Sequence, residues 1–137
     1  MTIEELNLIC KNTFIDLLGM HFLNFDGTCL TAELQVTPAH LQPTGFVHGG
    51  VYISMAESVA GAASMLLLKD DGKIPFGVTV NSQHLASISE GKIVASGKLV
   101  YEGTLKHIWD VKITNPAGKL ISISRVTNNI KKTEKSE

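Results

Sequence analysis

The amino-acid sequence predicts an α+β fold in which an antiparallel sheet wraps around one central helix. Residues 49–68 are mostly apolar and contain one charged side chain, which is typical of a helix buried on nearly all sides. The segments around this helix carry the alternation and the β-branched content of strands, and successive strands of this kind pair antiparallel. A chain of 137 residues fits one such domain, which we place at residues 1–130, followed by a short charged tail at residues 131–137.

The N-terminal segment predicts an amphipathic helix over residues 2–18. Its apolar side chains recur mainly at spacings of three and four, so they form one stripe on the helix surface. Thr2 and Glu5 stand in the order of a capping box, and Gly19 is suited to end the helix.

Six further segments are expected to be strands. The first two flank Gly27, and their alternation predicts a hairpin. A loop at residues 38–45 then leads into the central helix, and a turn at residues 115–118 joins the last two strands. The expected strands are residues 20–26, 28–36, 76–85, 92–101, 105–115 and 119–130.

Composition argues against several classes of protein. Twelve basic and thirteen acidic side chains give a net charge of −1, so no basic field indicates nucleic-acid binding. Cys10 and Cys29 lack the spacing of a metal site, and we expect free thiols and no metal. The apolar stretch at residues 49–68 raises a membrane-spanning alternative, but Glu57 and the lack of basic flanks argue against it. The N-terminal residues lack the pattern of a secretory signal, so we expect a cytoplasmic protein.

Glu57 is the charged residue of the central helix. An ionised carboxylate in an apolar environment is costly unless it is paired, so a catalytic role as general base or nucleophile is one explanation. The alternative is structural, with the side chain reaching solvent or binding nearby backbone.

His48, Gly49 and Gly50 stand where the loop becomes the central helix. The first turn of a helix has free N–H groups and a partial positive charge, which can stabilise a developing oxyanion. Glycine there would let a ligand carbonyl approach the backbone. The alternative is that the two glycines only form a tight turn.

The spacing of these groups has a consequence for assembly. Gly49 and Glu57 are separated by about 12 Å along a straight helix, at about 1.5 Å per residue. One carbonyl group cannot bridge that distance. If both residues act on the same substrate atom, they must come from two antiparallel copies of the helix, and the catalytic interpretation therefore requires a dimer.

The motif Q-P-x-G-x-x-H-G-G at residues 42–50, followed by A-E-S and by V-N-S-Q-H-L on the next strand, resembles the hotdog-fold acyl-CoA thioesterases. The likeness is to the phenylacetate-pathway, 4-hydroxybenzoyl-CoA and dihydroxynaphthoyl-CoA types. It implies hydrolysis of an acyl-CoA thioester with a small or aromatic acyl group. CoA is then part of the substrate, and no separate cofactor is expected.

The resemblance also implies roles for individual residues. Glu57 would be the catalytic carboxylate, as nucleophile or as base for water. The Gly49 N–H would bind the thioester oxygen, with Gln42 and His48 polarising the carbonyl from the partner subunit of a homodimer, which we expect to double into a homotetramer. The expected substrate contacts are Gly50, Asn81, His84, Gly103, Thr104 and Lys106.

Two other functions stay open from the sequence. Hotdog hydratases and dehydratases also set a His and an acid across a subunit interface, although this chain lacks the Pro-Gly dipeptide of those families. A non-catalytic acyl-CoA binding module is the other alternative, and Glu57 argues against it because a buried acid lowers stability without aiding binding. The chain also departs from the resemblance, since Gly61 and Ala86 stand where members often place polar side chains.

Overall fold

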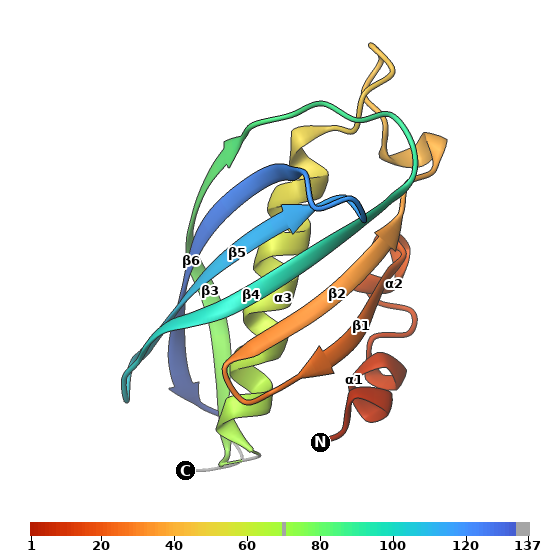
Figure 1. The fold of residues 1–137 in the computed structure, drawn as a ribbon. Coiled ribbons are helices and arrows are strands. Elements are labelled where there is room, and N and C mark those ends of the chain that lie inside the picture. Colours follow the sequence, from red (N-terminus) through yellow and green to blue (C-terminus); the bar gives the residue numbers. More distant parts are fainter. Residues whose placement is uncertain (70, 134–137) are drawn as a thin grey trace.

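The computed structural model describes residues 1–69 and 71–133 and shows one six-stranded antiparallel sheet wrapped around a long helix (Figure 1). The strand order is β1-β2-β4-β5-β6-β3. This confirms the predicted α+β class. The elements are α1 (Ile3–Ile9), α2 (Phe14–Leu18), β1 (Met20–Phe25), β2 (Cys29–Gln35), a short 3₁₀ helix (Pro38–His40), α3 (Gly49–Leu68), β3 (Lys73–His84), β4 (Lys92–Glu102), β5 (Lys106–Thr114) and β6 (Leu120–Lys132).

The N-terminal segment differs from the prediction, because two short helices replace the single helix expected at residues 2–18. The chain turns at Asn12, whose φ is 63° and whose N–H donates to the Asp16 carboxylate at 2.9 Å. Asn tolerates this left-handed conformation better than most residues, so the local hydrogen bond replaces the helical one. The predicted capping box of Thr2 and Glu5 is present.

Close packing of α3 on the sheet forms the core. Met55, Ala56 and Val59 are fully buried beneath the strands. A Cβ on Gly97 of β4 would lie 2.6 Å from the Val59 side chain, so the missing side chain lets the helix approach the sheet. By length and mean hydropathy α3 could cross a membrane, but its contacts with the surrounding strands identify it as the core helix of this fold.

One side of α3 is not covered by the sheet, so the prediction of burial on nearly all sides is wrong for the single chain. The strands curve around the helix and leave an opening between β3 and the N-terminal helices. Glu57 is exposed there, and its carboxylate is not enclosed by apolar side chains of its own chain. We call this surface the open face of α3; it consists of Ile53, Ser54, Glu57, Ser58, Gly61 and Met65.

β3 forms an edge of the sheet. It pairs with β6 on one side, and within residues 1–69 and 71–133 no strand pairs with its other side. Its register shifts between Gly77 and Thr79, which is a β-bulge, and its exposed apolar side chains are Ile74, Phe76 and Val78. A long, apolar, unpaired edge is a surface on which another strand can pair.

The C-terminal boundary also differs from the prediction. β6 includes Lys131 and Lys132, which we had placed in the charged tail. Residues 134–137 of that predicted tail lie outside the described residues.

Candidate active site

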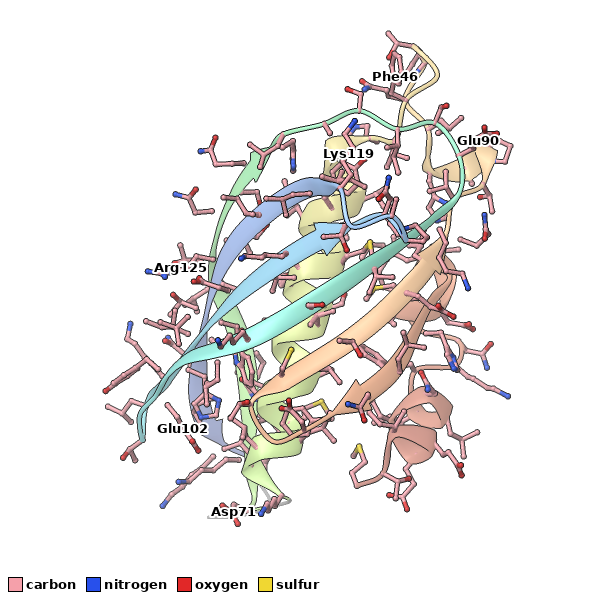
Figure 2. All side chains as sticks on the ribbon, in the orientation of Figure 1. Phe46, Asp71, Glu90, Glu102, Lys119 and Arg125 are labelled. Atoms are coloured by element: carbon pink, nitrogen blue, oxygen red, sulfur yellow. The ribbon has the colours of Figure 1, made fainter. Side chains whose placement is uncertain are left out.

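A tight loop brings the predicted motif to the start of α3. Leu41 and Val47 form an isolated bridge, and between them the Gln42 N–H donates to the Phe46 carbonyl at 2.8 Å. Gly45 has a φ of 90°, a conformation that glycine adopts without strain. The loop projects beyond the sheet, with Phe46 near its tip (Figure 2). Because the Leu41–Val47 bridge closes the loop, its two ends, at Gln42 and His48, lie at the same end of the molecule.

His48 caps the helix with its side chain. Its Nδ1 accepts a hydrogen bond from the Gly50 N–H at 2.8 Å, so Nδ1 is unprotonated and the neutral ring carries its proton on Nε2. A Cβ on Gly50 would lie 2.9 Å from Nδ1, which explains the glycine. Gly50 thus serves the cap, while in the described parts of the chain the Gly49 N–H has no acceptor.

His84 packs directly on Gly49. A Cβ on Gly49 would lie 2.9 Å from the His84 ring atoms Cδ2 and Nε2. On the other side of the ring, Nδ1 lies 2.8 Å from the Ser122 hydroxyl, which itself donates to the Gln83 carbonyl at 3.2 Å. The Ser122 oxygen therefore accepts the Nδ1–H, and the neutral ring presents an unprotonated Nε2 toward Gly49.

The structure therefore gathers two imidazoles around one free backbone N–H. His48 offers an N–H donor and His84 an acceptor, both beside Gly49. The ring of Tyr52 supports His84 at 5.3 Å between centroids. The Gly49 N–H and the His48 Nε2–H are donors of the kind that polarises a carbonyl group.

Glu57 lies two turns further along α3, about 12 Å from Gly49 along the helix axis at about 1.5 Å per residue. Its carboxylate rests against β3, where a Cβ on Gly77 would lie 2.8 Å from Oε1. Among the described residues the Glu57 carboxylate has no hydrogen-bond or salt-bridge partner. Our sequence reasoning missed Gly77, although a glycine inside a predicted strand signals a close approach of another group.

The structure does not bring the other predicted contacts to this cluster. Asn81 lies on the outer face of the sheet with Asp110 and Arg125, whereas the neighbouring His84 faces the helix. Residues 103–105 form the β4–β5 turn, and the Gly103 N–H donates to the carbonyl of Lys106, the first residue of β5, at 2.8 Å. In Figure 2, Glu102, which directly precedes this turn, lies far from Phe46, which is near the tip of the loop that leads into α3. Gly103, Thr104 and Lys106 are thus distant from Gly49 within one chain.

Neither cysteine is arranged as a nucleophile. Burial raises the pKa of the Cys10 thiol, and Asp16 raises it further. Burial and Asp26 likewise raise the pKa of the Cys29 thiol. Both are free thiols, and the described part of the chain holds no group of three His, Cys, Asp or Glu residues that could bind a metal ion.

A family model described as the thioesterase superfamily matches residues 44–122, which is more than half of the chain and includes Gly49, Glu57 and Gly77. The chain belongs to the thioesterase superfamily. Its activity is accordingly that of a thioester hydrolase acting on acyl-CoA, which confirms the class of enzyme that the sequence predicted.

Individual relatives agree with this assignment. Protein PA1618 of Pseudomonas aeruginosa is 35% identical over 125 residues, which are 91% of this chain and 86% of the relative. The crystal structure of a mutant of that protein, described as a thioesterase, covers 97% of this thioesterase and 96% of its own chain with a TM-score of 0.93 at 32% identity. The 1,4-dihydroxy-2-naphthoyl-CoA hydrolase of Listeria monocytogenes is 33% identical over 118 residues, which are 86% of this chain and 95% of the relative.

Proposed function

We propose that this thioesterase hydrolyses acyl-CoA thioesters with a small or aromatic acyl group to the free acid and CoA, at a site shared by two subunits. The observation that carries the proposal is the free Gly49 N–H flanked by His48 and His84, with one uncovered carboxylate on the same helix. The name of the Listeria relative, which acts on a fused aromatic acyl-CoA, supports an aromatic substrate.

The distance between Gly49 and Glu57 requires the second subunit. Two copies of α3 packed antiparallel through their open faces would bring Glu57 of the partner subunit beside the Gly49 N–H. The unpaired edge of β3 offers a matching contact, because two such edges can pair antiparallel into one continuous sheet. We further propose that the dimers associate into a homotetramer through the outer faces of their sheets.

In this site the thioester oxygen accepts hydrogen bonds from the Gly49 N–H and from Nε2–H of His48, with the Gln42 amide as a further donor. These donors stabilise the charge that develops on the oxygen when the carbonyl carbon is attacked. The oriented His84 ring contacts the bound thioester beside Gly49. We propose that residues 103–106, and Lys106 in particular, meet the nucleotide end of CoA.

Glu57 of the partner subunit supplies the attack by one of two routes. Its carboxylate can add to the carbonyl carbon, so that the C–S bond breaks, CoA leaves as the thiolate and takes up a proton, and water then hydrolyses the mixed anhydride. Alternatively, the carboxylate removes a proton from a water molecule that attacks the same carbon. Both routes convert thioester and water into acid and thiol, and neither needs a separate cofactor.

The proposal is tested by thiol release over a panel of short-chain, medium-chain and aromatic acyl-CoAs. Glu57→Gln removes the carboxylate charge but keeps the shape of the side chain, so kcat should fall by roughly a thousandfold or more while the fold stays intact. Full activity in this variant would refute the catalytic assignment. CoA binding without thiol release would indicate a binding module, and hydration of enoyl-CoA without thiol release would indicate a hydratase.

A cytoplasmic location belongs to the same proposal. The two free cysteines suit a reducing compartment.

A further inference from the structure

Asn128 of β6 binds α3 one turn beyond Glu57. Its side chain is fully buried, and its Nδ2 donates to the Ala60 carbonyl at 3.1 Å and to the Ser64 hydroxyl at 3.0 Å. Glu57, Ala60 and Ser64 follow one another at spacings of three and four residues, so they share one side of the helix. Asn128 therefore ties the sheet to the side of α3 that carries the carboxylate.

Asn128 also stands opposite Gly77, the residue on which the Glu57 carboxylate rests. Asn128 and Gly77 are paired residues of the antiparallel strands β6 and β3, so both face α3 from the same side of the sheet. A Cβ on Gly77 would lie 2.8 Å from Oε1 of Glu57 and 3.2 Å from its Cγ and Cδ. One pair of residues thus makes both contacts, because the amide binds the helix backbone while the glycine leaves room for the carboxylate.

Stability alone does not explain an amide at this position. The Ala60 carbonyl can only accept a hydrogen bond, so Nδ2 of Asn128 must face it and Oδ1 must face away. Among the described residues this buried Oδ1 has no hydrogen-bond partner. A buried acceptor without a partner is destabilising, and an apolar side chain of the same shape would avoid it. A polar residue that lowers stability in this way is typical of a functional site.

From these contacts we propose that Asn128 is a positioning residue for Glu57. By holding the Ala60 turn of α3 against β6, it fixes the distance and the rotation of the helix relative to Gly77. The point from which the carboxylate projects toward the thioester is thereby fixed as well. Asn128 itself touches neither the substrate nor the reacting atoms. This inference rests on the proposed function, because it assumes that Glu57 is the catalytic carboxylate.

Asn128→Leu tests this role, because leucine has the same branching as asparagine but cannot donate a hydrogen bond. We expect kcat for the best acyl-CoA of the panel to fall by about tenfold or more, since a small displacement of a reacting group is costly. KM should change by less than about twofold, because no substrate contact is removed. The urea midpoint of unfolding should stay the same or rise, because the unpartnered oxygen is gone.

A double-mutant cycle shows whether the effect passes through Glu57. In a Glu57→Gln background, Asn128→Leu should lower the residual kcat by less than about twofold, because the carboxylate to be positioned is already absent. Trp109→Phe is the matched control within the same network. It removes the Nε1–H bond from Trp109 to Ser64 at 2.9 Å but leaves both bonds of Asn128, so it should lower the urea midpoint and keep kcat within about twofold.

Wild-type kcat in Asn128→Leu overturns the inference, and so does an equal loss of kcat with and without the Glu57 carboxylate. Asn128→Val, which has a smaller side chain and no donor, repeats the test if leucine is not accommodated. Failure of both variants to fold would mean that the amide serves the fold and not Glu57. Full activity in Glu57→Gln would refute the proposed function itself, whereas an inactive Glu57→Gln beside a fully active Asn128→Leu refutes the positioning role alone.

Discussion

Two glycines allow side chains of the candidate site to lie against the backbone in this thioesterase. Gly49 admits the His84 ring and Gly77 admits the Glu57 carboxylate, each where a Cβ would approach closer than 3.0 Å. Both contacts join α3 to β3, so the backbone of one element sets the position of a side chain on the other. Precise placement of this kind matters because small displacements of reacting groups are costly to catalysis.

Gly77→Ala tests this placement at the residue scale. The added Cβ would lie 2.8 Å from Glu57 Oε1, at the end of a flexible side chain, so the carboxylate should shift with little strain. We expect kcat to fall by about tenfold or more, with unfolding free energy within about 1 kcal/mol of wild type.

Gly97→Ala is the matched control. Its Cβ would lie 2.6 Å from Val59 in the core, so this variant should lose about 1–3 kcal/mol of unfolding free energy and keep the kcat of its folded fraction. Steady-state kinetics and urea unfolding of both variants make the comparison. Wild-type kcat in Gly77→Ala would contradict the positioning of Glu57 by β3.

At the scale of elements, a buried polar network joins α3 to β5 and β6. The Ser64 hydroxyl accepts from Trp109 Nε1–H at 2.9 Å and from Asn128 Nδ2–H at 3.0 Å. Its own proton is then directed to His107 Nδ1 at 2.8 Å, which requires that nitrogen to be unprotonated. The network thus holds His107 in its neutral form, deep in the fold.

This network predicts a pH dependence of stability. Burial lowers the pKa of His107 below its ordinary value of 6.5, against a smaller opposing effect of Glu102. The unfolded chain therefore binds a proton at His107 more readily than the folded chain does. The stability that the neutral, buried His107 contributes is fully present above about pH 6.5 and is lost as the pH falls through the pKa of His107 in the folded protein.

Urea unfolding between pH 7.5 and pH 5 measures this loss, with His107→Gln as the comparison because its amide is not protonated in that range. The wild type should lose more unfolding free energy across the range than His107→Gln does. Parallel pH profiles of the two proteins would show that His107 is not the group responsible.

The elements also show how far the sequence can be interpreted. The predicted bounds of α3 match the structure, because its apolar run is long and begins at a capping residue, His48. The break at Asn12 was missed because it depends on one local hydrogen bond to Asp16, which apolar spacing does not report. The exposure of Glu57 was only one of the alternatives left open, because the composition of a helix does not show which part of its surface the sheet leaves uncovered.

The residues of the candidate site were only partly predictable from the sequence. Gly49, His48 and Glu57 were predicted as site residues from their motif, whose spacing is local. Asn81 and His84 were expected together, but the structure turns them to opposite faces of β3, as alternation along a strand requires for residues three apart. Contacts between subunits depend on how the chains assemble, and the sequence of one chain indicates them only indirectly.

At the scale of the whole molecule, the outer face of the sheet is the surface on which we expect two dimers to meet. It carries the exposed ion pair between Arg125 and Asp110, with Nε and Oδ1 2.7 Å apart. Arg125→Glu sets two like charges side by side and, because the pair is exposed, should change the stability of the single domain little. We expect light scattering to show tetramers converted to dimers with activity per subunit retained. An unchanged tetramer would place the second interface elsewhere.

The central claim is that each active site combines Glu57 from one subunit with Gly49, His48 and Gln42 from the other. Complementation between two inactive variants tests it most directly. One variant is Glu57→Ala. The other combines Gln42→Ala with His48→Asn, in which the Asn side chain can still cap α3 but no imidazole N–H remains.

A mixed dimer of these variants would hold one site with every lesion and one site with none. With random pairing, half of the dimers are mixed, so co-refolding should restore activity to roughly a quarter of the wild-type value. Absence of recovery, with subunit exchange shown by a mass tag, would contradict the account, because the groups would then act within one chain.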